Sequence, residues 1–537
     1  MTIIKDRLIY RRQFLLARQT VPELNGWQRL QVGQYYLHVH PDLMISVAHD
    51  SNKTLTLLGY LFDPESYQSS NQEILQRVLA ATKDFSSLIL ALKPYPGRYV
   101  VFYQDHGSLY LVHDALALRE VYYCQRENLV LCGSQPNLLV RFSQPKIQES
   151  SDPELLDFVR NHLPQIRNGR LWVGDGTPYE AVKHLLPNHY LDLTRMESHR
   201  YWPNTQLSRI ELDEAVYKCA AFLQGAMKAA AHRHPLMMAV TAGEDSRALL
   251  AASKEISSSV YFFINKHDKL NDRSSDIRIP KEIFRRIGIP FNVHQYPKDI
   301  PEGFKRIFLE NTFYAKDMLL PEIYHVYYNQ HSNKLNILGV GEVGRTKFFD
   351  EPKKLNPYYL AYMLRHRRSP YAVRECESWL ESAKSVACRY KLNIMTLFWW
   401  EALIGNWGSV GNSESDIAIE EFDPYASHFL YEMFLSVDPK YRTFRDNILF
   451  EELIRFMWPQ LLDVPVNPPD SIRGWLTLAI HKLGIENLLR KLKYNLYHFF
   501  YNVWWKRSKV QYLSTVMCEG FANALRFVSN RKSGGRI

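Results

Sequence analysis

The sequence predicts an α+β N-terminal region, an α/β region built on a parallel sheet, and a helical C-terminal part. Three observations lead to this fold class. Strand patterns separated by turns dominate residues 1–150. Residues 236–294 alternate between short apolar runs and helical patterns, which is typical of parallel strands joined by crossover helices. After residue 345 the apolar residues recur with helical spacing.

The α/β region begins with the apolar strand pattern Leu236–Val240, which a short turn separates from a helical pattern. The turn, Thr241–Ser246, reads T-A-G-E-D-S. Backbone N–H groups at a helix start carry partial positive charge, and Gly243 lets an anion approach the backbone closely. Asp245 could hold a divalent metal on phosphate groups, and Ser246 could donate to them. This pattern favours a phosphate site without Walker spacing; the alternative is an ordinary turn in which an acid or serine caps the helix.

The next elements complete the prediction of a parallel sheet. Val260–Ile264 and Phe291–His294 are strand patterns, and Asp276–Gly288 between them is a helical pattern that ends at a glycine. Because Pro280 is favoured in a first helical turn, that helix could instead begin there. In such sheets ligands bind at the carboxyl ends of the strands, which is where Asp245 falls.

At this turn the chain resembles the asparagine synthetases. That family opens its synthetase domain with S-G-G-x-D-S, the pyrophosphate loop (PP-loop) of AMP-forming enzymes. The matching positions here are Thr241, Ala242, Gly243, Glu244, Asp245 and Ser246. The family's next acidic position matches Asp276. The resemblance implies bound ATP, with Mg²⁺ held by Asp245 and Asp276. A substrate carboxylate would attack the α-phosphate to give an acyl-adenylate and pyrophosphate, and an amine would then displace AMP.

The resemblance extends over residues 50–470 in one order. Pro96–Tyr103, Leu109–Asp114 and Arg119–Tyr123 are similar to the glutaminase domain of glutamine-dependent synthetases. Leu185–Asp192 and Tyr201–Trp202 are similar to the stretch between the two domains. The resemblance implies an N-terminal Ntn-hydrolase-like sandwich. It also implies an α/β PP-loop domain of the adenine nucleotide α-hydrolase-like kind, with a Rossmann-like parallel sheet.

The expected glutaminase machinery is missing. The family's nucleophile is a cysteine directly after the initiator Met, whereas Thr2 follows Met1 here. A thiol is the better nucleophile near neutral pH, although a threonine can act after Met removal in some hydrolases. The family's N-G-E-I-Y-N strand corresponds to Leu58–Asp63, and its acidic S-D-x-E turn corresponds to Ser70–Glu73. We therefore expect a degenerate glutamine amidotransferase-like domain without glutaminase activity.

The second synthetase motif, S-G-E-G-x-D-E, is altered. It follows the strand pattern Leu335–Leu338, and its glycines match Gly339 and Gly341, but its acids are out of register. We expect Gly339 and Gly341 to approach the nucleotide, Glu342 to act as general base or metal contact, and Arg345 to neutralise phosphate. The alternative is a turn with a solvated Glu–Arg pair.

Composition limits the setting. The length of 537 residues implies two domains, and 46% apolar residues are enough for real cores. Six cysteines without metal spacing suit a reducing compartment. Because no secretory segment and no uncharged run of bilayer length are found, we expect a cytoplasmic protein.

The expected helices show where the motifs lie within the predicted domains. One helix is expected in residues 1–150, at Glu73–Ala81, with Asn71 or Ser70 as its cap. Leu212–Ala231 is a long amphipathic helix that leads into the first parallel strand. In the helical part, three tryptophans could line the pocket of the second substrate or belong to the core. They are Trp399, Trp400 and Trp407.

The end of the chain is basic and aromatic, and the whole chain has a net charge of +10 and a pI of about 9.0. Such a stretch could lie on an anionic membrane or grip nucleic acid. The expectation we favour is a C-terminal helix that packs its aromatic side chains on the domain and leaves Lys and Arg solvated.

These observations give four segments and one function. Residues 1–150 are the degenerate amidotransferase-like domain, 151–211 connect, 212–470 bind ATP, and 471–537 form a basic aromatic helical extension. The expected activity is an ATP-dependent, AMP-forming carbon–nitrogen ligase. Its partners are a small-molecule, peptide or sugar carboxylate and an amine donor, and nucleic acid is not expected. The alternatives are a PP-loop enzyme that modifies tRNA and a non-catalytic relative; oligomeric state stays open.

Overall fold

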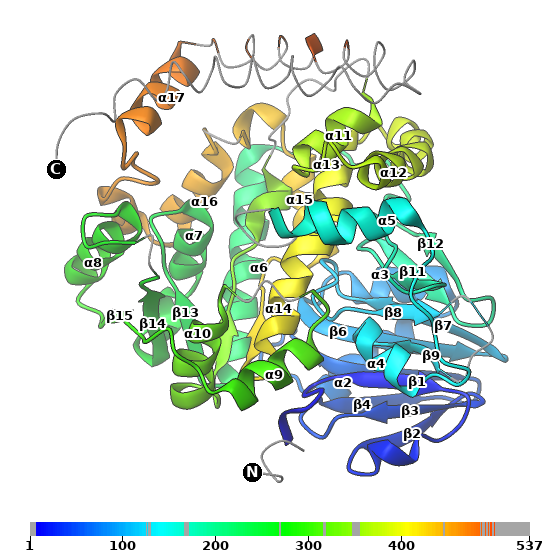
Figure 1. The fold of residues 1–537 in the computed structure, drawn as a ribbon. Coiled ribbons are helices and arrows are strands. Elements are labelled where there is room, and N and C mark those ends of the chain that lie inside the picture. Colours follow the sequence, from blue (N-terminus) through cyan, green and yellow to red (C-terminus); the bar gives the residue numbers. More distant parts are fainter. Residues whose placement is uncertain are drawn as a thin grey trace.

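The computed structural model describes residues 7–124, 126, 130–165, 171–267, 270–314, 318–345, 355–443 and 446–483, with a few single residues from 485 to 499. Antiparallel sheets occupy one side of the molecule and a parallel sheet the other (Figure 1). The coarse fold class predicted from sequence is therefore confirmed: antiparallel sheets come first, and a parallel sheet with helices follows.

The N-terminal strands form two six-stranded antiparallel sheets. The first has the order β10-β8-β9-β1-β3-β2 and contains β1 (Phe14–Ala17), β2 (Gln28–Val32), β3 (Tyr35–Val39), β8 (Tyr122–Cys124), β9 (Val130–Gly133) and β10 (Val182–His184). The second has the order β12-β11-β7-β6-β5-β4 and contains β4 (Ile45–His49), β5 (Lys53–Leu61), β6 (Gly97–Asp105), β7 (Ser108–His113), β11 (His189–Asp192) and β12 (Glu197–Arg200). Strands β10 to β12 fall in the segment expected to connect the domains, so these sheets continue to Arg200.

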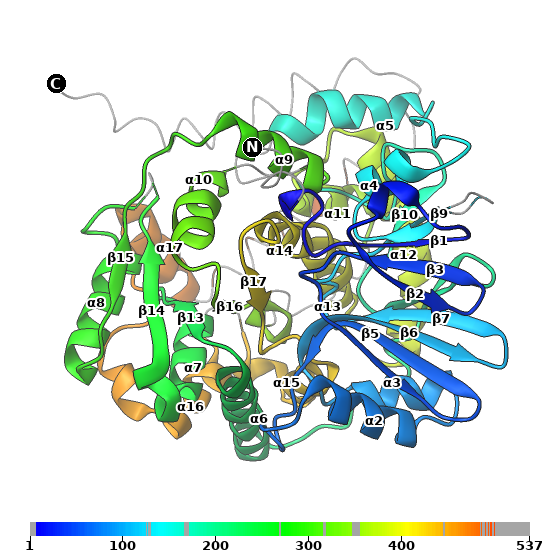
Figure 2. The same cartoon turned by 90° about the horizontal axis from the view of Figure 1, so that it is seen from below.

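The two sheets face each other across an apolar core. Leu16 and Leu37 of the first sheet pack in one cluster with Val100 and Leu111 of the second. Because side chains alternate along a strand, the opposite face of the second sheet is also apolar, and helices cover it (Figure 2). The covering helices are α2 (Asn71–Ala81) and α3 (Phe85–Leu92).

The predicted helix at residues 73–81 is confirmed, and its cap is Ser70. The Ser70 side chain accepts from the backbone N–H of Glu73, and the Glu73 carboxylate accepts from the backbone N–H of Ser70. The expectation of a single helix in this region was wrong, because α3 and α4 (Pro136–Phe142) also form. Helix α3 is nearly all apolar and only eight residues long, so it gave no amphipathic pattern.

The parallel sheet has the order β15-β14-β13-β16-β17. Its strands are β13 (Leu236–Ala239), β14 (Val260–Asn265), β15 (Asn292–His294), β16 (Leu335–Ile337) and β17 (Glu420–Phe422). Neighbouring helices are α6 (Leu212–Arg233), α7 (Glu244–Ala252), α8 (Ser275–Ile287), α9 (Glu302–Asn311) and α10 (Leu320–Glu322). Helix α8 begins at Ser275 and carries Pro280 inside it, so a start at Pro280 was wrong. Gly288 ends it with a φ of 70°, as predicted.

The remaining helices, all but one, lie C-terminal to the glycine motif of residues 339–344. They are α5 (Pro153–Asp157), which comes earlier in the chain, and α11 (Pro357–Met363), α12 (Pro370–Arg389), α13 (Ile394–Phe398), α14 (Ser409–Ser415), α15 (His428–Ser436), α16 (Ile448–Met457) and α17 (Ile472–Lys482). A π-helical segment, Trp399–Gly408, continues α13. Trp400 in it is fully buried and donates to the Ala115 carbonyl at 2.7 Å, so it belongs to the core and lines no pocket.

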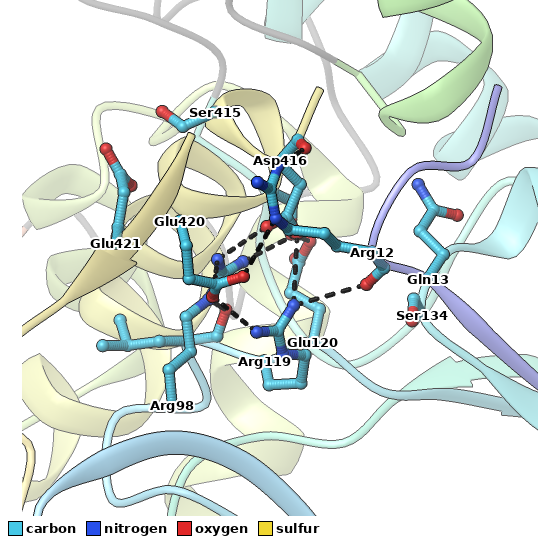
Figure 3. A network of polar contacts seen from close by, with 12 residues as sticks. Arg12, Gln13, Arg98, Arg119, Glu120, Ser134, Ser415, Asp416, Glu420 and Glu421 are labelled. Atoms are coloured by element: carbon cyan, nitrogen blue, oxygen red, sulfur yellow. Dashed lines mark hydrogen bonds and ion pairs between the residues drawn. The ribbon is translucent and has the colours of Figure 1, made fainter. Parts of the chain in front are cut away.

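A buried charge network joins the two halves (Figure 3). Arg98 of β6 forms a two-pronged pair with Asp416, at 2.7 and 2.8 Å, and Arg119 donates to Glu420 of β17 at 2.6 Å. Arg12, just before β1, adds a third guanidinium 3.2 Å from the Glu420 carboxylate. These five side chains, which we call the interface network, come from segments about 300 residues apart and lock the edge strand β17 onto β6.

A neighbouring acid gives the fold a predictable pH dependence. Burial raises the pKa of Glu421 to about 8, against the lowering effects of Arg98 and of hydrogen bonds from Asn336 and Ser415. The folded chain thus keeps a proton that the unfolded chain releases near its usual pKa of 4.5. Between these values the folded state binds more protons, so the stability contribution of Glu421 falls as pH rises.

Glu421→Gln is expected to flatten this dependence. Relative to wild type, its free energy of unfolding should rise by about 3 kcal/mol between pH 5 and pH 8, because glutamine does not ionise. Urea unfolding at both pH values measures the change, and Glu255→Gln, whose carboxylate is 64% exposed, is the control. Parallel pH profiles for wild type and Glu421→Gln would contradict the assignment.

Candidate functional site

The two predicted motifs lie together at the carboxyl edge of the parallel sheet. The segment of residues 240–243 follows β13, and that of residues 338–344 follows β16, the adjacent strand. Strands β14 and β15 lie on one side of β13, and β16 and β17 lie on the other. The strand order therefore reverses at β13 and β16, which is where open α/β sheets bind their ligands.

The predicted phosphate loop, Thr241–Ser246, is held by its own side chains. Ser246 Oγ accepts from the Thr241 backbone N–H at 3.1 Å and lies 3.0 Å from Thr241 Oγ1. Thr241 Oγ1 in turn accepts from the Gly243 backbone N–H at 3.2 Å. The Asp276 carboxylate reaches across from α8 and accepts from the Ala242 backbone N–H at 3.0 Å. Within the chain, side-chain oxygens therefore accept from the backbone N–H groups of Thr241, Ala242 and Gly243.

The glycines of the second motif lie against this loop, whereas their expected approach to a nucleotide stays a prediction. A Cβ on Gly341 would lie 2.6 Å from the Asp245 carboxylate, closer than any side chain tolerates. A Cβ on Gly339 would lie 3.7 Å from the Ser246 backbone nitrogen. The lack of a side chain at Gly341 is therefore what lets the two segments meet, whereas the distance at Gly339 is an ordinary contact.

Arg345 lies over the start of α7. Its guanidinium donates to Glu244 at 2.9 Å and to Asp245 at 2.5 Å, and it lies 3.7 Å from Glu342. Burial alone would lower the pKa of Arg345, but the charges of Asp245, Glu244 and Glu342 raise it above its ordinary value. Arg345 is thus a fixed cation at the predicted phosphate loop, and the alternative of a solvated Glu–Arg pair was wrong, because Arg345 is mostly buried.

Glu342 lies between the guanidinium of Arg345 and the indole ring of Trp399. Its carboxylate accepts from Trp399 Nε1 at 3.1 Å, and about a third of the side chain is exposed. Trp399 is therefore the tryptophan of the three that contacts a predicted site residue, whereas Trp407 is exposed. Trp399 therefore orients Glu342, whose side chain stays partly exposed.

A strap of residues 461–470 fixes the loop from its other side. Arg247, fully buried on α7, donates to the Val464 carbonyl at 2.6 Å and to the Pro465 carbonyl at 2.9 Å. The Asn467 backbone N–H donates to the Ala242 carbonyl at 3.0 Å. The strap therefore holds the loop backbone at the end of β13, a role that the sequence did not reveal.

The acids predicted to hold magnesium make different contacts. Asp245 is paired with Arg345, and Asp276 accepts from the loop backbone. Within the described ranges, no group of three or more His, Cys, Asp or Glu residues is arranged to hold a metal by itself. Mg²⁺ in nucleotide sites commonly uses one or two carboxylates plus phosphate oxygens, so the donor chemistry of this pair fits a metal that arrives with ATP.

Asp423 is a site residue that sequence reasoning missed. It directly follows β17, is fully buried, and accepts from the backbone N–H groups of Val340 and Tyr425, both at 2.9 Å. Burial raises the pKa of Asp423 to about 7, against these two donors. Tyr425 OH donates to the Asp245 carbonyl at 3.0 Å. The three-residue strand β17 has no apolar run, which is why the pattern gave no signal.

The positions that the resemblance matched to a glutamine site contain structural groups. Leu58–Asp63 spans the end of β5 and the residues after it, and the Tyr60 hydroxyl donates to the Glu421 carbonyl. The beginning of β1 borders the interface network through Arg12. Thr2 lies outside the described residues. The loss of glutaminase activity stays a prediction, to which the buried network adds support.

Known proteins give little guidance. No protein-family model and no curated protein matches the sequence. Among solved structures, a glutamine phosphoribosylpyrophosphate amidotransferase from B. subtilis, complexed with ADP and GMP, is 11% identical over 57% of this chain and 88% of its own, with a TM-score of 0.23. A structure described as the allosteric regulatory enzyme of purine biosynthesis is 12% identical over 68% and 74%, with a TM-score of 0.22. Likenesses this weak carry no argument, so function must be argued from the site.

Proposed function

We propose that this chain is an ATP-dependent, AMP-forming amide ligase of the asparagine synthetase kind, without a working glutaminase. One observation supports this most. The loop after β13 and the glycine segment after β16 meet where the strand order reverses, with Arg345 fixed above them. Neither segment alone is specific, but their meeting at one sheet edge matches what a triphosphate needs.

The residues of the loop would bind the triphosphate tail. Backbone N–H groups of Ala242 and Gly243 would exchange their present partners for phosphate oxygens. The hydroxyls of Thr241 and Ser246 would donate to the same oxygens. Arg345 would neutralise charge on the departing pyrophosphate, for which a guanidinium is well suited.

Magnesium would be held by Asp245 and Asp276 together with phosphate oxygens, and it would supply charge neutralisation to the leaving pyrophosphate. The chain itself holds the two acids in position. Helix α7 fixes Asp245, and Asp276 projects from the start of α8. Both acids therefore face the loop from rigid elements.

The proposed reaction has two balanced steps. A carboxylate oxygen of the substrate attacks the α-phosphorus of ATP, the bond to the bridging oxygen breaks, and pyrophosphate leaves. An amine then attacks the acyl carbon, AMP leaves, and one proton must be removed from the nitrogen. We assign the removal of that proton to Glu342, and the contacts of its carboxylate with Trp399 and Arg345 support this assignment. Much of the acceleration would come from proximity and charge neutralisation.

Product identity tests the proposal. The full chain would be incubated with ATP, Mg²⁺ and panels of small-molecule, peptide and sugar carboxylates, with ammonia or primary amines. We expect AMP and pyrophosphate in equal amounts with the correct pair, detected by chromatography and a pyrophosphate assay. Release of ADP and phosphate would contradict the mechanism.

A non-catalytic relative is the second candidate, and one observation favours it. Arg345 already pairs with Asp245, and the loop backbone is bonded within the chain. Such a site could be permanently closed. Calorimetry with Mg²⁺ and ATP separates the candidates, because a closed site takes up no nucleotide.

A further inference from the structure

Helix α17 exposes apolar side chains. Ile472, Trp475, Leu476 and Leu483 are 82%, 58%, 60% and 71% exposed. Their spacing of three, four and seven residues places them on one helical face. Figure 1 shows α17 at the periphery, beyond α16 and away from the antiparallel sheets. Nothing described in the chain covers this face.

A second row of apolar residues follows the end of α17 at Lys482. Ile485, Leu489, Leu492 and Leu496 are exposed, and they recur every three to four residues. The expectation that the C-terminal helix packs on the domain was therefore wrong for the described residues; most of the predicted aromatic side chains lie outside them. We call these eight exposed residues together the docking face: Ile472, Trp475, Leu476, Leu483, Ile485, Leu489, Leu492 and Leu496.

The charge of the chain is concentrated here. Residues 471–537 contain twelve Lys and Arg and two acids, which accounts for the whole net charge of +10. Residues 1–470 are therefore neutral overall. Arg490, Lys491 and Lys493 interrupt the apolar residues of the docking face in the sequence. An exposed apolar face within a strongly basic segment is typical of helices that lie on anionic membranes.

We propose that the docking face binds an anionic membrane surface. Nucleic acid fits less well, because phosphate and base contacts would leave aliphatic side chains such as Ile472 and Leu476 exposed. A second copy of the chain would bring two strongly positive segments together. Trp475 suits the boundary between headgroups and acyl chains. Across the described part of the chain, no helix has the length and apolarity needed to cross a bilayer.

Docking would place the candidate nucleotide site next to the membrane. Asp470, two residues before α17, accepts from the backbone N–H and the hydroxyl of Ser275, both at 2.9 Å. Ser275 precedes Asp276, which bonds to the phosphate loop. The docking segment is thus tied to the carboxyl edge of the sheet by a rigid connection, and a substrate held in the membrane would lie within reach of that edge.

Vesicle sedimentation of the full chain tests this inference without any need for ATP. Phosphatidylcholine vesicles with about 30% phosphatidylserine should sediment the chain, pure phosphatidylcholine should sediment much less, and 0.5 M salt should weaken the binding. Absence of binding to the anionic vesicles would overturn the proposal.

Two variants separate the apolar and the basic contributions. Trp475→Glu with Leu476→Glu should weaken vesicle binding at least about tenfold, because both side chains leave the acyl boundary. Leu90→Glu on α3, where leucine is 57% exposed, is the matched control and should bind like wild type. Arg490→Ser with Lys491→Ser and Lys493→Ser should reduce the salt dependence. Two results would overturn the proposal. The first is that the variant with both glutamates binds vesicles like wild type. The second is that the wild-type chain binds no vesicles but forms a dimer, which the two glutamates dissociate.

Discussion

Replacing Asp245 by alanine is expected to lower ATP-dependent pyrophosphate release about 10²–10³-fold. Asp245 lies at the first turn of α7, and its carboxylate is 2.5 Å from the Arg345 guanidinium. Its loss would remove a proposed magnesium ligand and leave Arg345 with fewer charge partners at the loop. Steady-state pyrophosphate release with saturating ATP measures the effect.

Glu255→Ala is the matched control for Asp245, because Glu255 follows the same helix but is 64% exposed. It should retain wild-type turnover, and an Asp245→Ala variant that also does so would contradict the proposed site. Arg345→Gln adds a second readout by calorimetry. In a working ligase it should weaken ATP binding, whereas in a permanently closed site removal of the cation should create or increase Mg²⁺–ATP uptake.

Replacing Arg98 by methionine is expected to reduce the free energy of unfolding by about 3–5 kcal/mol. Arg98 is fully buried, and it pairs with both oxygens of Asp416 and with Glu420 at 3.2 Å. Although burial opposes its charge, these acids raise the pKa of Arg98, so it is always a cation. Without it, two carboxylates would stay buried with too few partners.

The exposed Arg126, 62% accessible and paired with Glu180 at 3.0 Å, offers a control for the Arg98 experiment. Arg126→Met should change stability by less than about 0.5 kcal/mol, because exposed pairs contribute little. Adding Asp416→Leu to Arg98→Met should recover part of the loss, since it removes the orphaned charge. Urea unfolding measures all three, and a loss below about 1 kcal/mol for Arg98→Met would show that the interface network is dispensable.

Much of the fold could be predicted because the residues that indicate a strand, a turn or a helix end stand close together in the sequence. A turn was correctly expected between a strand and a helix, because an apolar run, a glycine and a helical pattern follow each other directly, but the helix begins at Glu244, inside the predicted turn Thr241–Ser246. Gly288 was identified as a helix end from its own chemistry, and Ser70 was one of the two candidates for a helix cap. Strand β17 was missed, because three residues that include two glutamates carry no apolar period.

The candidate site was predicted in its members but not in its contacts. Gly339, Glu342 and Arg345 were singled out because their segment resembles the second synthetase motif, and the structure brings them to the loop after β13. Arg345 and Asp245 are 100 residues apart in the chain, and they can pair only because β16 lies next to β13 in the sheet. Asp423 and the strap were missed for a related reason, because their roles depend on backbone far away in the sequence, such as Val340 for Asp423 and Ala242 for the strap.

By itself the sequence determined the kinds of element, their order, the chemistry of the loop and the concentration of positive charge near the end of the chain. These properties depend on side-chain period, turn residues and composition, all of which are local. Only the tertiary structure decided that Arg98 and Asp416 neutralise each other, that a cation sits at the phosphate loop, and that the apolar face of α17 is uncovered. Pairing and burial depend on which distant segments meet, and sheet packing, not any local pattern, sets those encounters.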